Sequence, residues 1–374
     1  VARSVTGRLF CGLRGAPGWI RQATPLPDAP PGAARPAAAA RGVAPGAAAD
    51  YLAPTLRALM PDPSTLADMD AAAERPAPAV MGGERVALFG DYDADGACSV
   101  ALVQDWLAAL GREATPYIPD RIAEGYGPNT PAMRGLAEGH RLILCLDCGT
   151  MAHAPIAEAR AAGAEVLVID HHLPGETLPP AGAVVNPNRA DCPSGLGQLC
   201  AAGVAFLLLV AANRVLRRRG WFRARPEPDL RARLDLVALA TVADVAPLTG
   251  LNRAFVRQGV AVLARRGRPG LAALADVARL TAQPTSRDLG FALGPRINAG
   301  GRIGEASLGA RLLTAATPEE AAAIAERLER LNRERRDVET AVLEAACEQI
   351  EARGTEAPLV WAAGEGWHPG VVGI

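Results

Sequence analysis

Three carboxylates stand within five residues in the segment 91–96, whose sequence is DYDADG. Asp91, Asp93 and Asp95 would repel one another strongly on a single turn unless a cation lay among them. The segment follows an apolar run at 86–90 that is typical of a buried strand. The carboxyl end of such a strand is where α/β enzymes place their chemistry. The pattern therefore predicts a cation site, with a solvated acidic turn as the alternative.

Two further acids also follow apolar runs. Asp147 comes after residues 142–146, and Asp170 comes after residues 166–169. The carboxyl ends of parallel strands lie at one edge of a sheet, so we expect both acids to converge with Asp91 on one crevice.

A pair of histidines follows the third of these acids. His171 and His172 come directly after Asp170, and adjacent side chains at a strand end point to opposite sides. One imidazole can therefore bind a metal while the other faces a substrate. A single histidine in this place is more often structural, so the adjacent pair is the informative feature.

The charges of the candidate ligands balance two divalent cations. Asp93, Asp95, Asp147 and Asp244 supply four negative charges, and neutral His171 is a further ligand. Carboxylates with an imidazole suit Mn²⁺, and Mg²⁺ is also possible. Two such ions are the usual apparatus for hydrolysis of a phosphoester.

Asp244 lies near the end of an apolar helical pattern at 234–245. A carboxylate buried in such a helix is costly unless it is paired or bound to metal. The alternative for Asp244 is an acid at an exposed helix end.

Two polar segments are candidates for binding a substrate. In the loop that precedes the strand at 142–146, Arg121 can grip a phosphate and Tyr126 can stack on a base. The segment 294–302, GPRINAGGR, reads as a glycine-rich loop that lets the backbone approach a ligand while arginine offers forked donors. The alternatives are a structural loop and a plain turn.

The elements that must position these residues alternate between strand and helix. Short apolar runs at 86–89, 142–146 and 166–169 alternate with helical patterns at 97–110 and 152–162. This order predicts a parallel sheet with right-handed crossovers, and residues 201–278 follow as a mostly helical portion. The fold class is therefore α/β.

Four segments make up the predicted domain organisation. Residues 1–50 form a flexible arm, rich in Ala, Pro and Gly, for which an organellar transit peptide is the alternative, and residues 51–316 form the catalytic domain. A capping box at 317–320 opens a connecting helix that runs to 354. Residues 355–374, with a strand at 358–362, begin a second α/β domain, and we expect the chain to be a C-terminally truncated fragment.

One proline-rich segment conflicts with this plan. Pro76 and Pro78 interrupt a helix that should lead to the first strand, so we expect a local rearrangement there.

Composition excludes several classes of protein. The chain has 374 residues, 49% of them hydrophobic, and a net charge of −1, so it is globular and has no global basic field. Its basic residues are all arginine. Seven scattered cysteines favour a reducing compartment, and the CxxC formed by Cys145 and Cys148 lacks a partner pair at zinc spacing. No apolar run is long enough to predict a membrane span.

The motifs together resemble the DHH phosphoesterases and, within them, the bacterial RecJ single-strand-specific 5′ exonucleases. The resemblance spans residues 42–374. It rests on GDYDADG (90–96), IPDRIAEGYGPN (118–129), LDCG (146–149), IDHHLPGETLPPAGAVVNPN (169–188), LDLVALATVADVAPL (234–248), LGFALGPRINAGGRIG (289–304) and GWHPGVVGI (366–374).

The resemblance implies a role for each matching position. It implies that the metal ligands are Asp93, Asp95, Asp147, His171 and Asp244. It further implies that Asp91 and Asp170 support that site and that His172 lies near the scissile phosphate, while Asn298 and Arg302 face the substrate.

The implied reaction is Mg²⁺- or Mn²⁺-dependent hydrolysis of single-stranded DNA from its 5′ end to mononucleotides, in DNA recombination and repair. The implied setting is a cytoplasmic monomer, without membrane contact, beside a single-strand-binding protein and a helicase.

Two departures and two alternatives accompany this resemblance. The family's later glycine- and histidine-rich motif and its OB-type domain do not follow, so we expect an intact metal core with weak strand capture and weak or no activity. The first alternative is a DHH phosphodiesterase for short oligonucleotides or cyclic dinucleotides. The second is a non-catalytic scaffold, against which every matched ligand residue is present.

Overall fold

The computed structural model describes residues 2–3, 9–10, 41–354 and 359–373. The chain divides into two compact units, residues 1–53 and 54–374. In the first unit, β1 (Ala2–Arg3) pairs antiparallel with β2 (Leu9–Phe10), and the short helices η2 (Pro45–Ala47) and α2 (Ala48–Leu52) follow. Most of the predicted arm at 1–50 lies outside the described residues, so its flexibility stays a prediction.

A five-stranded parallel sheet organises the second unit. Its strands, in spatial order, are β4 (Ala114–Tyr117), β3 (Val86–Gly90), β5 (Leu142–Leu146), β6 (Glu165–Ile169) and β7 (Ala183–Val185). The predicted parallel sheet is therefore confirmed. The sequence pattern did not indicate β4 and β7. β4 is an edge strand that contains Pro116, and β7 has only three residues.

The register of the sheet aligns the carboxyl ends of four strands, β3, β5, β6 and β7. Gly90 lies opposite Leu146, Leu146 opposite Ile169, and Ile169 opposite Val185. The residues that follow these four positions therefore emerge side by side at one edge of the sheet.

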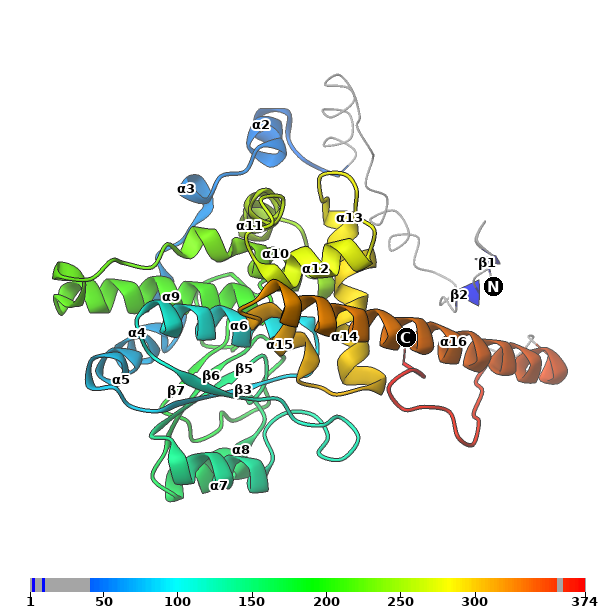
Figure 1. Ribbon diagram of the computed structural model, residues 1–374, viewed down its shortest axis with the longest axis horizontal. Helices are drawn as coiled ribbons and strands as arrows, with labels where there is room; N and C mark the ends of the chain where they lie inside the picture. Colours follow the sequence, from blue (N-terminus) through cyan, green and yellow to red (C-terminus); the bar gives the residue numbers. More distant parts are fainter. Residues whose placement is uncertain (1, 4–8, 11–40, 355–358, 374) are drawn as a thin grey trace. The chain divides into compact units, whose positions relative to one another are not determined.

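Helices cover both faces of the sheet, which explains why its central strands are apolar throughout. One face packs against α7 (Thr130–Gly139) and α8 (His153–Ala161), and the other against α6 (Ala94–Ala109) and α9 (Ala201–Arg218), as Figure 1 shows. Along β3, Leu88 belongs to the α6 side, whereas Ala87 and Phe89 belong to the other.

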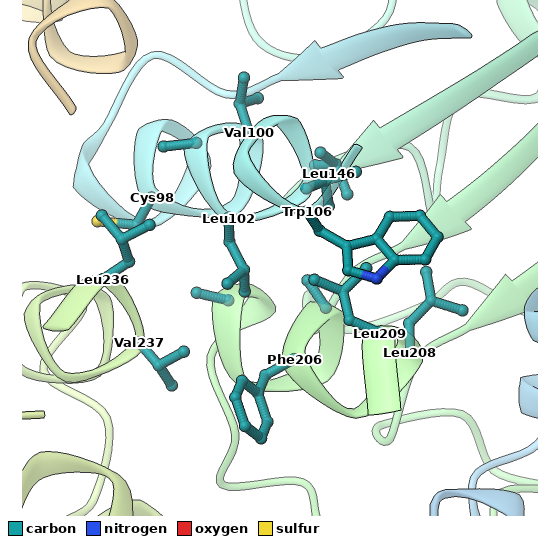
Figure 2. Close-up of a cluster of buried hydrophobic side chains, with 14 of the residues drawn as sticks. Cys98, Val100, Leu102, Trp106, Leu146, Phe206, Leu208, Leu209, Leu236 and Val237 are labelled. Carbon is teal, nitrogen blue, oxygen red and sulfur yellow. The ribbon is translucent and has the colours of Figure 1, made fainter. Parts of the chain in front are cut away.

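The largest apolar core lies where α6, α9 and α10 (Leu234–Ala243) meet (Figure 2). Trp106 of α6 is 1% exposed and Phe206 of α9 is 2% exposed. The indole Nε1 of Trp106 donates to Asn213 Oδ1 at 2.8 Å, so the one polar atom of that side chain is satisfied. The apolar stretch that begins α9 is a buried helix.

Smaller elements precede β3. They are α3 (Leu56–Leu59), η3 (Pro63–Thr65), α4 (Met69–Glu74) and α5 (Pro76–Gly82). The helix that leads to β3 is interrupted, as expected from Pro76 and Pro78. The chain forms two short helices that meet at Arg75, and both prolines lie in the first turn of α5, where the missing N–H groups have no intrahelical partner to lose.

The helical portion continues after α9. It comprises η4 (Trp221–Arg223), η5 (Leu230–Arg233), α10, α11 (Gly250–Leu263), α12 (Pro269–Val277), α13 (Ser286–Asp288), the π-helix η6 (Leu289–Leu293), α14 (Gly294–Ile303) and α15 (Leu308–Thr314). Among the described helices, none is both long and apolar enough to cross a membrane.

The long helix α16 (Pro318–Arg353) begins and ends as the sequence predicted. Thr317 Oγ1 accepts from the backbone N–H of Glu320 at 3.2 Å, but the Glu320 carboxylate accepts from Ala316 rather than from Thr317. Only half of the predicted capping box is therefore present.

The prediction of a strand at 358–362 was wrong. The structure describes residues 359–362 of this segment, and they form no strand. A strand needs a hydrogen-bonded neighbour, and this segment instead contacts α16. The carbonyl oxygen of Trp361 accepts from Arg353, and the backbone of Ala363 bonds the side chain of Gln349.

Candidate metal centre

The acidic segment after β3 turns directly into α6. Asp93 caps the helix, because its Oδ1 accepts from the backbone N–H groups of Asp95 at 2.8 Å and Gly96 at 3.0 Å. α6 therefore begins at Ala94, three residues before the predicted start at 97, because the cap lies inside the acidic motif. A β-carbon at Gly96 would collide with the backbone of Asp91, so glycine is required for this close turn.

The carboxylate of Asp95 is held at the start of another helix. Its oxygens accept from Ala201 N at 2.7 Å and Ala202 N at 2.8 Å, at the N-terminus of α9. These are N–H groups that a helix leaves unsatisfied, and the helix dipole favours an anion there. Asp95 is 1% exposed, and burial raises its pKa.

Asp91 and Asp147 each present a buried carboxylate oxygen that has no hydrogen-bond partner among the residues that the structure describes. The atoms are Asp91 Oδ1 and Asp147 Oδ1, and the residues are 5% and 2% exposed. Asp147 also has a left-handed backbone, with φ of 63°, which is uncommon outside glycine. A buried anionic oxygen without a partner is costly, and an oxygen-binding cation is the group that would satisfy it.

His171 lies among three of the predicted ligands. Its Nε2 is 3.3 Å from Asp147 Oδ1, 3.7 Å from Asp95 Oδ2 and 3.9 Å from Asp244 Oδ2. Asp244 occupies the C-cap of α10, which ends at Ala243 rather than at the predicted 245.

The predicted ligands form overlapping groups whose ligand atoms all lie within 4.8 Å of one another. One group is Asp95, His171 and Asp244, the second is Asp91, Asp93 and Asp147, and the third is Asp147, His171 and His172. The structure thus brings together every residue for which the sequence indicated a metal role. That they bind metal stays a prediction.

Mutual repulsion and burial disturb the ionisation of this cluster. Burial, and then the charge of Asp93, raise the pKa of Asp91 to about 8, and burial with the charge of Asp95 raises that of Asp244 to about 7. Burial and the neighbouring acids also raise the pKa of Asp147 well above its usual range. The cluster therefore carries more negative charge than the described part of the chain neutralises.

Asp170 is the exception among these acids. Burial acts to raise its pKa, but the hydrogen bond and charge of His172, together with hydrogen bonds from Thr150, hold that pKa at about 2. Asp170 Oδ1 lies 2.7 Å from His172 Nδ1. The same hydrogen bond raises the pKa of His172, whose side chain is 45% exposed. The two imidazoles do not point to opposite sides, because their ring centroids lie only 4.8 Å apart. His171 is the more buried of the two, with a side chain that is 17% exposed. That His172 faces a substrate stays a prediction.

The prediction of a glycine-rich loop at 294–302 was wrong, because these residues form the helix α14. Its glycines serve close packing: a β-carbon at Gly301 would collide with the carbonyl oxygen of Tyr92, in the acidic segment. Asn298 Oδ1 accepts from the backbone N–H of Ala94 at 2.7 Å and so satisfies the first turn of α6. Arg302 Nη1 donates to the carbonyl oxygen of Gly370 at 3.1 Å.

The loop between β4 and α7 brings two more predicted residues to the centre. The Arg121 guanidinium carbon lies 5.0 Å from the ring centroid of Tyr92. Tyr126 Oη lies 3.1 Å from His172 Nδ1, and the residue is 53% exposed. Burial, and then the charge of Arg121, lower the pKa of Arg302, which indicates that two cations flank the acids.

Sequence reasoning gave no role to Thr150, Asn186 and Asn188, which bond the turn that carries the two histidines. The available signal was the polar segment NPN directly after an apolar run at 183–185. That run is only three residues long, so its strand was not predicted.

Comparisons with known proteins agree with this geometry. The profile described as the DHH family, N-terminal domain, matches residues 85–241. The single-stranded-DNA-specific exonuclease RecJ of Dickeya dadantii is 42% identical over 361 residues, which cover 94% of this chain and 62% of that protein. The corresponding protein of Escherichia coli is 43% identical over 303 residues, covering 78% of this chain and 52% of that protein.

Solved structures give the same result. A crystal structure of exonuclease RecJ bound to manganese is 37% identical with a TM-score of 0.71, covering 82% of this chain and 76% of that one. RecJ from Thermus thermophilus in complex with Mn²⁺ is 35% identical with a TM-score of 0.72, covering 92% of this chain and 50% of that one.

The chain spans about half to two thirds of the length of the curated relatives it matches. Its DHH domain, its parallel sheet and its identity to these proteins agree, and the chain belongs to the RecJ family.

Proposed function

We propose that this chain carries the active centre of a metal-dependent exonuclease that hydrolyses single-stranded DNA from its 5′ end to mononucleotides. The observation that supports it most is that one buried carboxylate oxygen each of Asp91 and Asp147 has no hydrogen-bond partner in the described part of the chain, while His171 Nε2 lies 3.3 Å from that of Asp147. The family relatives are named single-stranded-DNA-specific exonuclease, and two of their structures contain manganese.

Asp93, Asp95, Asp147, His171 and Asp244 would hold Mn²⁺ or Mg²⁺, because oxygen-rich sites with one imidazole suit these ions. A bound pair of ions supplies a hydroxide nucleophile at neutral pH and stabilises the attacking and leaving oxygens of a phosphodiester. Asp91 supports the site from the same turn.

His172 and Asp170 act on the substrate side of this centre. Asp170 Oδ1 accepts a hydrogen bond from His172 Nδ1, which raises the pKa of the imidazole and fixes its ring. A half-exposed, protonated imidazole can donate to a phosphate oxygen as negative charge develops there. Tyr126 contacts the same ring from the opposite loop and offers an exposed aromatic face to a base.

Arg121 and Arg302 flank the acids and would bind the phosphates of the strand. Forked guanidinium donors match phosphate oxygens, and their positive charge counters the acidic centre toward a polyanion. Asn298 supports this side of the site by holding the start of α6.

The remaining proposals concern the setting. We place the enzyme in the cytoplasm as a monomer that takes part in DNA recombination and repair, where a helicase and a single-strand-binding protein would supply its substrate.

Digestion of single-stranded DNA labelled at either end tests the function. We expect Mn²⁺-dependent release of labelled mononucleotide from the 5′-labelled strand at early times, slow loss of the 3′ label, and no attack on blunt duplex. Arg121→Gln should raise KM more than it lowers kcat. Asp93→Ala is the inactive control.

Two results would contradict the proposal. Turnover of cyclic dinucleotides or dinucleotides alone would favour the short-substrate phosphodiesterase, and Mn²⁺ binding without cleavage of either substrate class would favour the scaffold.

A further inference from the structure

The turn that carries the two histidines is held from both sides by side chains. The backbone N–H groups of His171 and His172 donate to Asp170 Oδ1 at 2.8 and 3.2 Å. Their carbonyl oxygens accept from two asparagine amides, that of His172 from Asn186 at 2.8 Å and that of His171 from Asn188. All four backbone polar groups of the two histidines are therefore bonded to side chains.

The fifth strand delivers these asparagines. Asp170 N donates to Val185 O at 3.1 Å, so Asn186, the next residue after β7, emerges beside Asp170. Asn186 is 0% exposed. An amide follows β7, whereas a carboxylate follows each of β3, β5 and β6, so β7 adds donors to the centre without adding charge.

The orientation of the Asn186 amide is fixed. Its Oδ1 accepts from the backbone N–H of Asn188 at 2.8 Å, and that group can only donate. Its Nδ2 therefore faces His172 O and Thr150 Oγ1, the latter at 3.0 Å. Thr150 in turn donates its N–H to Asp170 Oδ2 at 3.0 Å, which closes the network.

We propose that Asn186 and Asn188 are positioning residues for the metal centre, which act by fixing the backbone of His171 and His172. The inference rests on the proposed metal site. Neither asparagine belongs to the groups of acids and histidines that could hold a metal. Instead, each fixes the backbone of one histidine and thereby the position of its imidazole. The Nε2 of His171 serves three carboxylates at 3.3–3.9 Å, so a small rotation of its backbone would take it from all of them at once.

Mn²⁺ affinity of the folded protein tests this role, measured from the free-ion signal in electron paramagnetic resonance. The principal variant is Asn188→Ala, because Asn188 is partly exposed and its removal should leave the fold intact. The second is Asn186→Ala. We expect each to weaken Mn²⁺ binding about 10- to 100-fold, as loss of a group that supports a metal ligand does.

Asn213→Ala is the matched control. Asn213 is also buried, at 3% exposed, and its side chain makes two hydrogen bonds, to Trp106 and Pro228, where that of Asn186 makes three. We expect it to lower the melting temperature about as much as Asn186→Ala does while Mn²⁺ affinity stays unchanged.

Wild-type affinity in folded Asn188→Ala would overturn the inference, as would an equal loss of affinity in all three variants, since that would mean general loosening. If Asn186→Ala does not fold, Asn188→Ala decides alone. Failure of the wild-type chain to bind Mn²⁺ would instead remove the proposed function, so the two failures are distinguishable.

Discussion

Two clusters of buried acids lie along the same helix, and they are neutralised in different ways. Near the start of α6, Asp95 lies close to Asp147 and Asp244. Within the described part of the chain, the basic side chain at ion-pair distance from all three is His171. Toward the end of α6, Asp105 joins Asp235 around Arg268, with N–O distances of 2.7 and 2.9 Å.

The difference separates a structural cluster from a functional one. Arg268 is 12% exposed and Asp235 5%, so the protein supplies its own counter-charge and needs no ligand there. Among the described residues, the proposed metal centre instead leaves Asp91 Oδ1 and Asp147 Oδ1 without a hydrogen-bond partner. Buried acids alone therefore do not mark a site; buried acids without a protein cation do.

Asp147→Asn breaks the metal centre and has the largest expected effect. Exonuclease activity should fall at least about 1,000-fold, because metal catalysis supplies several kcal/mol and each 1.36 kcal/mol is a factor of ten. The metal-free protein should become more stable in urea unfolding, because one repelling charge is gone. A variant that is less stable without metal would contradict the account of Asp147.

Asp235→Asn should do the opposite. It leaves Arg268 buried with one partner fewer, so we expect the free energy of unfolding to fall by about 3–5 kcal/mol. The Mn²⁺ affinity of the folded fraction should be unchanged. Loss of metal binding in folded Asp235→Asn would mean that the two clusters are not independent.

The pH dependence of the metal-free protein sharpens the contrast. Asp91 and Asp244 have pKa values of about 8 and about 7 when folded, against about 3.9 when unfolded. Between pH 4 and 8 the folded state therefore binds more protons, so stability falls as pH rises. The raised pKa of His172 acts in the same direction, since the stability it adds is present at low pH and lost as pH rises through its folded value.

We expect the free energy of unfolding without metal to drop by roughly 2–4 kcal/mol from pH 5.5 to pH 8. Saturating Mn²⁺ should remove most of that drop. The measurement is urea unfolding at both pH values, with Asp91→Asn as the control variant that should show a shallower dependence. Equal slopes with and without Mn²⁺ would contradict it.

A smaller effect is expected where α14 meets the acidic segment. Gly301→Ala would push the β-carbon against Tyr92 O and shift the turn that holds Asp93. We expect Mn²⁺ affinity to fall about 10-fold. Gly135→Ala is a control on α7, where an added β-carbon meets nothing within 4 Å, and calorimetry of both variants checks the prediction.

The sequence predicted much of this arrangement because short patterns encode it. Three buried strands are apolar runs that end in Asp91, Asp147 and Asp170, and the parallel register levels those ends. The predicted start of α6, at residue 97, lies three residues beyond its actual start at Ala94. The sequence prediction used Asp93 only as a metal ligand, although Asp93 is also the N-cap of this helix.

Other parts depend on contacts that no local pattern reports. α14 contains three glycines and resembles a loop in sequence, yet it is a helix because packing on Tyr92 and the hydrogen bond from Ala94 N to Asn298 stabilise it. Asn186 owes its position to a three-residue strand whose existence is known only from its pairing with β6.

Calorimetric titration of the metal-free chain with Mn²⁺ tests the central claim most directly. The account predicts two ions bound per chain in wild type and in Asp235→Asn, and fewer in Asp147→Asn. Binding that Asp147→Asn leaves unchanged, or no binding by the folded wild-type chain, would contradict it.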